Sequence, residues 1–289
     1  MESLTGKTAV ITGAASGMGR AFADRFAAAG MRVVLADIEQ GALDTAVEEL
    51  RATGATAIGV RTDVSSEADM RALADRAISE LGPVNVVCLN AGVAGGNGPI
   101  ETLTAADWQW TLGVNLWGIV HGIGAFLPHL KEHGDGHVVI TASIAGLTSY
   151  PGAAPYNTTK HAAVAIAETM FSGLRDSGSS VGVSCLCPGI VQTRIIDSER
   201  NRPEELRRPH IPEAPTADQM QMHKVVLDIF GQAKPPHEVA DLVHDAVLAK
   251  RFWVFTDEVY TPAIHDRLDS IRNATDPPAT GSLIEVYLR

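Results

Sequence analysis

The sequence predicts an α/β fold: a doubly wound, parallel sheet of seven strands with helices on both faces. Three observations support this prediction. Short runs rich in β-branched residues alternate with longer helical stretches along the chain. The strand-like runs are continuously apolar, as expected when both faces of a sheet are covered. Glycines or polar residues follow six of the strands, at the carboxyl ends where such sheets bind ligands.

The strands and helices alternate strictly through most of the chain. The predicted strands are Thr8–Thr12, Arg32–Ala36, Thr56–Arg61, Val84–Leu89, Gly136–Thr141, Val181–Cys187 and Phe252–Phe255. The helices between and around them are Gly17–Ala29, Gln40–Thr53, Glu67–Leu81, Ala105–Leu130, Pro155–Asp176 and His237–Ala249. Right-handed crossovers then bring all carboxyl ends of the strands to one edge of the sheet. A polar tail follows, with one helix at Pro262–Arg272.

No linker divides the chain, so we expect one domain over residues 1–289. Residues 194–236 break the alternation, because this stretch is long, charged and contains prolines. A connection of this length in a compact domain is usually a functional segment. We interpret it as a lid over the substrate, since it leaves the binding edge of the sheet. An ordinary surface excursion with short helices is the alternative.

Composition excludes several classes of partner. The formal net charge is −11, from 23 basic and 34 acidic residues. Such a surface repels nucleic acids and anionic membranes, so neither is expected as a partner. No apolar run approaches about 18 residues, and Met1-Glu2-Ser3 begins no signal peptide. The three cysteines, Cys88, Cys185 and Cys187, lie in apolar strands, which indicates free thiols and a cytoplasmic location.

A glycine-rich turn joins the first strand to the first helix. In the run Thr12-Gly13-Ala14-Ala15-Ser16-Gly17-Met18-Gly19, Gly13 allows a tight turn, and Gly17 and Gly19 let backbone N–H groups approach a phosphate. Because this turn lies between a strand and a helix, it predicts a site for a dinucleotide pyrophosphate.

Two carboxylates follow the next strands. Asp37 ends the second strand, where a carboxylate accepts hydrogen bonds from ribose hydroxyls and repels a 2′-phosphate, which favours NAD over NADP. Asp63 and Val64 would contact adenine. For both aspartates the alternative is a helix N-cap, of the helix near Gln40 for Asp37 and of the helix after Ser65 for Asp63.

Tyr156 and Lys160 are four residues apart on a predicted helix and therefore share one face. An unperturbed tyrosine titrates near ~10, and a neighbouring ammonium group favours the phenolate. This pair suggests proton transfer beside a nicotinamide. His129, His133 and His137 recur at a spacing of four, but we interpret them as solvated histidines at a helix end, with no metal site expected.

Taken together, these residues resemble the short-chain dehydrogenase/reductase (SDR) family over roughly residues 5–255. The matching residues are Thr12-Gly13-x-x-x-Gly17-x-Gly19, Asn90-Ala91-Gly92, Asn115, Ser143, Tyr156-x-x-x-Lys160 and Pro188-Gly189-x-x-x-Thr193. One departure is Leu89, where the family often has a second asparagine.

The resemblance implies a Rossmann-like fold and a mechanism with four catalytic residues. Tyr156 would be the general acid or base, Lys160 would bind the nicotinamide ribose, Ser143 would hold the substrate oxygen, and Asn115 would bend its helix around a water. The expected contacts with NAD are Gly13, Ser16, Gly17, Met18, Gly19, Asp37, Ile38, Asp63, Val64, Asn90, Ala91, Gly92, Tyr156, Lys160, Pro188, Gly189, Val191 and Thr193. The resemblance also implies a homotetramer or homodimer that packs through its two longest helices.

The expected substrate is a small-molecule secondary alcohol or ketone that is bulky and hydrophobic, because the side chains predicted to contact it are mostly apolar. The predicted contacts are Ser143, Ile144, Tyr150, Tyr156, Ile190, Ile195 and Ile196, with Val93, Ala94 and Ala153 beside them. Two alternatives stay open at this point. One is an NADPH-dependent reductase of ketoacyl or enone groups, and the other is a non-catalytic protein that senses nucleotides.

Overall fold

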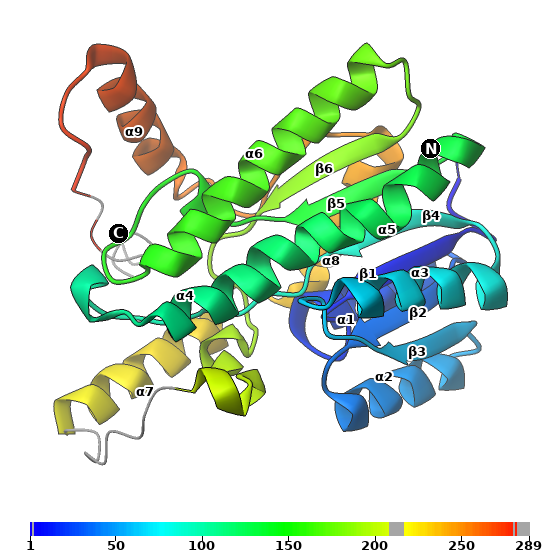
Figure 1. Ribbon diagram of the computed structural model, residues 1–289, viewed down its shortest axis with the longest axis horizontal. Helices are drawn as coiled ribbons and strands as arrows, with labels where there is room; N and C mark the ends of the chain where they lie inside the picture. The colour runs from blue at the N-terminus through cyan, green and yellow to red at the C-terminus, as the bar shows by residue number, and fades with distance from the viewer. Residues whose placement is uncertain (2, 208–216, 280, 282–289) are drawn as a thin grey trace.

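The computed structural model describes residues 1, 3–207, 217–279 and 281, and it confirms the predicted α/β sheet (Figure 1). All seven strands are parallel, in the order β3-β2-β1-β4-β5-β6-β7. Each strand agrees with its predicted range to within one residue at either end. The strands are β1 Thr8–Thr12, β2 Arg32–Asp37, β3 Ala57–Arg61, β4 Val84–Leu89, β5 His137–Thr141, β6 Gly182–Cys187 and β7 Trp253–Phe255.

The helices connect these strands on both sides of the sheet. They are α1 Gly17–Ala28, α2 Gln40–Ala52, α3 Glu67–Leu81, α4 Ala105–Leu112, α5 Gly118–His133, α6 Ala154–Asp176, α7 Ala217–Gln232, α8 Pro236–Ala249 and α9 Thr261–Asn273. Four short 3-10 helices lie in the connections: η1 Ile100–Thr102, η3 Ile144–Gly146, η4 Ile195–Asn201 and η5 Glu204–Leu206. Among the described residues, α7 is a helix that the sequence interpretation did not locate.

The sheet separates two apolar cores. Successive residues of a strand point to opposite faces, so Val10 belongs to one core and Ile11 to the other. The first core is covered by α3, α5 and α6, and the second by α1, α2 and α8. Representative buried side chains are Met70, Phe126 and Ala163 in the first core and Phe22, Leu43 and Val243 in the second. Both faces of the sheet are therefore covered by apolar side chains, which explains why the strand sequences are continuously apolar.

The predicted helix Ala105–Leu130 is wrong as a single element. A π-helix, Gly113–Trp117 (η2), separates α4 from α5, and the helix continues to His133. The cause is Asn115, whose Oδ1 accepts from the Val93 N–H at 2.8 Å and whose Nδ2 donates to the Val93 carbonyl at 2.9 Å. Single π turns of this kind are frequent at functional sites. Gly134, with φ of 71°, ends the helix in the left-handed conformation.

The segment 194–236 is only partly covered by the structure. Its described portions contain η4, η5 and α7, while residues 208–216 lie outside the described residues. The predicted tail helix is present as α9, and the end of the chain beyond residue 281 also lies outside them.

The helical stretch Ala105–His133 is long and apolar enough to cross a membrane by length and composition, since it contains an 18-residue window with a mean hydropathy of 1.3, of which 39% is buried. This finding qualifies the expectation that no apolar run approaches that length. Core helices pass the same test, and Ile119, Phe126 and Leu130 of this stretch are buried in the core that faces the sheet. The stretch therefore behaves as part of the α/β core.

The three histidines that recur at a spacing of four have different surroundings. The rings of His129 and His133 lie 4.8 Å apart, and each Nε2 bonds to the backbone of Val84, at 3.2 Å to its nitrogen and 2.7 Å to its oxygen. His137 is buried in β5, with its Nε2 2.8 Å from the Ser184 hydroxyl. The interpretation of His137 as a solvated residue is therefore wrong, because strand β5 carries it into the interior.

Burial of His137 predicts a loss of stability in acid. Burial lowers its pKa from 6.5 to about 3, with smaller effects from the N-terminal amine and Lys250. The unfolded chain therefore binds one more proton than the folded chain between pH 6.5 and 3, and stability falls as the pH falls through that window. For one proton, the free energy of unfolding can fall by at most ~1.4 kcal/mol per pH unit. The variant His137→Gln keeps a polar partner for Ser184 but removes the titrating group. When the pH is lowered from 7.5 to 5, we expect its free energy of unfolding, measured in urea, to fall by about 2 kcal/mol less than that of the wild type. Equal losses would contradict this assignment.

Candidate active site

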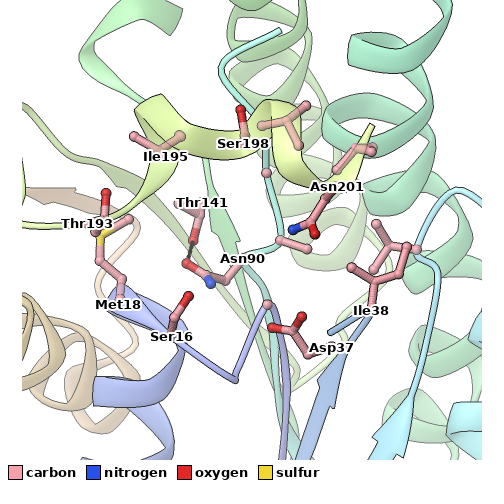
Figure 2. A pocket seen from close by; sticks show the side chains of 18 of the residues that line it. Ser16, Met18, Asp37, Ile38, Asn90, Thr141, Thr193, Ile195, Ser198 and Asn201 are labelled. Carbon is pink, nitrogen blue, oxygen red and sulfur yellow. Dashed lines mark hydrogen bonds between the residues drawn. The ribbon is translucent and has the colours of Figure 1, made fainter. Parts of the chain in front are cut away.

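A cleft opens where the strand order reverses, between the carboxyl ends of β1 and β4 (Figure 2). Thr12 at the end of β1 holds the two strands together, since its Oγ1 accepts from the N–H groups of Asn90 and Ala91 at 2.9 and 3.1 Å. Asn90 also accepts a hydrogen bond from Thr141 at the end of β5. The crossovers diverge on either side of this point, which leaves room for a ligand.

The glycine turn at the cleft is shaped for close approach by a ligand. Gly13 and Gly17 have φ of 66° and 55°, in the left-handed region that favours glycine. A Cβ on Gly19 would lie 2.0 Å from the Gly13 carbonyl oxygen, so the turn and α1 pack without a side chain. The N-terminus of α1, which follows Ser16, thus opens into the cleft with its N–H groups exposed to an anion. These features fit the pyrophosphate of a dinucleotide.

The two predicted carboxylates both line the cleft, and neither is a helix N-cap. Asp37 accepts hydrogen bonds from the N–H groups of Ala15 and Glu39, at 2.9 and 3.0 Å. It thereby ties the glycine turn to the end of β2, while Glu39 occupies the N-cap position of α2. Asp63 accepts from the N–H and hydroxyl of Ser65, and the cap of α3 is Ser66. Asp37 and Asp63 are therefore placed toward the cleft by short turns.

Tyr156 stands at the other end of the cleft, near the start of α6. Burial raises the pKa of its phenol, and a hydrogen bond with Ser143 partly offsets that shift. The expectation of a lowered pKa does not hold for the polypeptide alone. The reason is the position of Lys160, whose Nζ lies 5.5 Å from the centre of the Tyr156 ring and is not hydrogen-bonded to its hydroxyl. The protein thus favours the protonated phenol.

Lys160 is held by backbone at the base of the cleft. Its Nζ donates to the Thr141 carbonyl at 2.9 Å, and 3% of the residue is exposed. Burial lowers its pKa from 10.5 to about 8. Gly92 lies close to both polar groups, because a Cβ on it would be 3.7 Å from the Lys160 Nζ and 3.4 Å from the Asn115 Oδ1. The ammonium group remains largely charged at pH 7.

Most of the residues predicted to contact the cofactor do lie around one cleft. The predicted residues that line it are Gly13, Ser16, Gly17, Met18, Gly19, Asp37, Ile38, Asp63, Val64, Asn90, Ala91, Gly92, Tyr156, Lys160, Pro188 and Thr193. Val93 and Ile195, predicted beside the substrate, line it as well. Thr193 packs against the glycine turn, because its Cγ2 would lie 3.1 Å from a Cβ on Gly17.

The remaining predicted residues do not line this cleft. They are Ala94, Asn115, Ser143, Ile144, Tyr150, Ala153, Gly189, Ile190, Val191 and Ile196. Asn115 is bonded to Val93, and Ser143 contacts Tyr156 from behind the lining, with its Oγ also accepting from the Ala145 N–H at 3.1 Å. Ile144, Tyr150 and Ile190 are buried. Gly189 faces the ring of Tyr260, which would be 2.2 Å from a Cβ there.

The sequence interpretation missed ten residues of the lining. They are Glu39, Thr62, Trp110, Val114, Thr141, Ala142, Arg194, Ser198, Arg200 and Asn201. Trp110 lines the cleft, with the Arg202 guanidinium 5.1 Å from its ring centre. Figure 2 shows Ser198 and Asn201 on the segment that crosses the cleft opposite the glycine turn. Their position depends on contacts far away in sequence, so no local pattern could reveal it.

Comparisons with known proteins agree with this geometry. Residues 7–204 match the family model described as short chain dehydrogenase. A dehydrogenase/reductase of CLA biosynthesis from Lactiplantibacillus plantarum is 30% identical over 94% of this chain and 95% of its own length. A 1-deoxy-11-beta-hydroxypentalenate dehydrogenase from Streptomyces exfoliatus is 34% identical over 94% of this chain and 91% of its own.

A solved structure extends the match to three dimensions. The crystal structure of a short chain dehydrogenase/reductase from Burkholderia phymatum in complex with NAD is 42% identical, with a TM-score of 0.90 over 96% of this chain and 98% of that one. The chain therefore belongs to the short-chain dehydrogenase/reductase family, and it is an oxidoreductase that uses a nicotinamide cofactor.

Proposed function

We propose that the protein transfers a hydride between NAD(H) and a secondary alcohol or ketone. The observation that carries this proposal is the placement of Tyr156 and Lys160 in the same cleft as the glycine turn and Asp37, with Ser143 hydrogen-bonded to the phenol. A nicotinamide cofactor held by the glycine turn, Asp37 and Thr193 would supply the hydride. The side chains around it supply the proton and hold the substrate oxygen.

Tyr156 is the proposed proton donor in reduction and the proton acceptor in oxidation. Because burial raises its pKa, the phenol is protonated at neutral pH and suited to donate to a carbonyl oxygen. Ser143 shares a hydrogen bond with this phenol and would polarise the same oxygen. Oxidation requires the phenolate, which the positive charge of the oxidised nicotinamide would favour. Asn115 is the proposed fourth member, since it fixes the π-helix beside Gly92 and Lys160.

Asp37 is the proposed determinant of NAD preference, because a carboxylate at the end of β2 repels a 2′-phosphate. Asp37→Ser removes the charge and leaves a hydroxyl that can accept from Ala15 or Glu39. We expect the ratio of the Kd for NADPH to that for NADH, measured by nucleotide fluorescence, to fall at least about tenfold. Asp44→Asn, an exposed residue of α2, is the control. An unchanged ratio in Asp37→Ser would rule out this role.

The proposed substrate is a bulky hydrophobic alcohol or ketone. Val93, Trp110 and Ile195 contribute apolar surface to the cleft that contains Tyr156. Three relatives from Streptomyces carry the name 1-deoxy-11-beta-hydroxypentalenate dehydrogenase, which supports the same class. Residues 194–236 would cover this substrate as a lid, and the position of η4 at the cleft supports that function.

A substrate panel tests the proposal. Hydrophobic secondary alcohols and ketones, compact polyols, ketoacyl thioesters and enones are assayed in parallel with NAD(H) and NADP(H). We expect turnover with the hydrophobic alcohols or ketones and NAD(H). Equal turnover of a polyol would contradict the substrate class. Turnover confined to ketoacyl or enone substrates with NADPH would establish the biosynthetic alternative.

We also propose that the protein assembles as a homotetramer or homodimer through its longest helices. Trp117 and Val120, at the junction of η2 and α5, are 52% and 38% exposed, and Phe171 of α6 is 37% exposed. Large apolar side chains gathered on two helices are typical of an interface. Light scattering of the wild type and of Trp117→Glu would report the state directly.

A further inference from the structure

The segment Ile195–Asn201 (η4) is fastened to the body of the protein on its inner side. The Ser198 hydroxyl, which lines the cleft, accepts from the Ala94 N–H at 3.0 Å. Directly after η4, the Arg202 guanidinium donates to Asp107 Oδ1 at 2.8 Å, with side-chain exposures of 1% and 0%. The first contact holds the middle of η4, and the second, which is buried, holds the residue that follows its end.

The outer side of the segment is held by a single carboxylate oxygen. Glu39 Oε1 accepts from Arg200 Nε at 3.0 Å, from Arg200 Nη2 at 2.7 Å and from Asn201 Nδ2 at 2.8 Å. Burial raises the pKa of Glu39, but these hydrogen bonds and the Arg200 charge more than offset that effect, so the pKa is lowered. The carboxylate is therefore ionised at neutral pH, and its bonds are charge-assisted.

Arg200 is also braced on its own segment. Its Nη1 donates to the carbonyls of Arg194 and Asp197 at 3.2 and 2.9 Å. This bracing reduces the rotamer freedom that an exposed ion pair normally has to lose. The side chains of Arg200 and Glu39 are each 27% exposed, so solvent screens the contact only in part. The pair is better organised than an ordinary surface salt bridge.

The location of this contact relates it to the cofactor. Glu39 is two residues beyond Asp37, and its N–H donates to Asp37 Oδ1. Glu39, Arg200 and Asn201 all line the cleft, and they meet across a separation of about 160 residues in the chain. The contact thus joins the end of β2 to the segment that crosses the cleft. Figure 2 shows Asp37, at the end of β2, and Asn201, on that segment. It closes the cleft at the end that contains Asp37.

We propose that Glu39, Arg200 and Asn201 form a clasp that holds η4 over the adenosine end of the cofactor and slows cofactor release. The inference rests on the proposed assignment of this cleft to NAD(H). A dinucleotide beneath η4 leaves only after the clasp opens, because the inner side of the segment is fixed by buried contacts. Glu39 is then a retention residue, distinct from Asp37, which would bind the ribose itself.

Two other functions for the same residues predict different results. If Arg200 instead pairs with a cofactor phosphate and Glu39 merely competes for it, Glu39→Gln should slow NADH release while Arg200→Gln accelerates it. If Glu39 binds the cofactor directly, Glu39→Gln should accelerate release and Arg200→Gln should leave it unchanged. The clasp alone requires both variants to accelerate release and their effects to be non-additive in the double variant.

Stopped-flow fluorescence measures NADH release from the wild type, Glu39→Gln, Arg200→Gln and the double variant after mixing with excess NAD. We expect each variant to release NADH about fivefold to tenfold faster, and the double variant to be no faster than either single variant. Glu49→Gln is the matched control, since Glu49 lies on α2 and pairs with Arg20 at 2.7 Å on the surface. Release rates equal to the wild type in both single variants would overturn the clasp.

A second measurement needs no cofactor. Hydrogen–deuterium exchange of residues 195–201 is expected to be faster in Glu39→Gln than in the wild type, and unchanged in Glu49→Gln. The same exchange in Glu39→Gln and the wild type would overturn the clasp independently. If the wild type binds neither NADH nor NADPH, the proposed assignment of the cleft to NAD(H) is wrong. The exchange experiment then tests only whether the contact of Glu39 with Arg200 and Asn201 holds η4 in place.

Discussion

Replacing Tyr156 by phenylalanine is expected to lower kcat by about 10²–10⁴-fold, the usual contribution of a positioned proton donor. The physical reason is that the phenol lies in the cleft and is hydrogen-bonded to Ser143, whereas the Nζ of Lys160 donates to the Thr141 carbonyl. Steady-state kinetics on any substrate found in the panel measure the loss.

The ring itself should stay in place in this variant. Phenylalanine retains the contacts that Tyr156 makes with the apolar cluster of Ile144 and Tyr150. We therefore expect the Kd of NADH to change less than about twofold, a free-energy change well below 1 kcal/mol. Weakened NADH binding together with lost turnover would show that the hydroxyl acts by holding the cofactor. Unchanged kcat would refute its assignment as proton donor.

Replacing Arg202 by methionine is expected to cost about 3–5 kcal/mol of folding free energy, the usual effect of removing one partner of a buried ion pair. Arg202 and Asp107 are almost fully buried, and Asp107 also accepts from the N–H and hydroxyl of Thr104 in the capping box of α4. Without the guanidinium, the carboxylate keeps the cap but loses the buried charge of Arg202. Urea unfolding at fixed protein concentration measures the difference.

A nearby exposed pair serves as the control for this prediction. Arg207 contacts Glu204 at 2.6 Å with side-chain exposures of 54% and 81%, so Arg207→Met should cost less than about 1 kcal/mol. The double variant Arg202→Met/Asp107→Asn should recover part of the loss, because both charges of the buried pair are then removed together. A cost in Arg202→Met no larger than in Arg207→Met would show that the buried pair does not anchor the segment.

Elements that depend on neighbouring residues were predictable from the chain. The seven strands agree with their predicted ranges to within one residue at either end. The end of α5 lies at His133, three residues beyond the predicted Leu130, because the helix continues to Gly134, which adopts the left-handed conformation. The resemblance to the family predicted that Asn115 distorts its helix, but the residues alone did not predict that the distortion is a π-helix. It exists because the Asn115 amide bonds to Val93, a contact made only once the chain has folded.

The sequence by itself determined the sheet, the glycine turn, Asp37 and the pair Tyr156 and Lys160. Each of these is a pattern within a few residues, read through backbone geometry and helical spacing. Only the tertiary structure decided that Ile144, Tyr150 and Ile190 are buried away from the cleft, and that Glu39 and Arg200 meet across it. Such contacts depend on how elements far apart in the sequence pack against one another, and a local sequence pattern does not determine that packing.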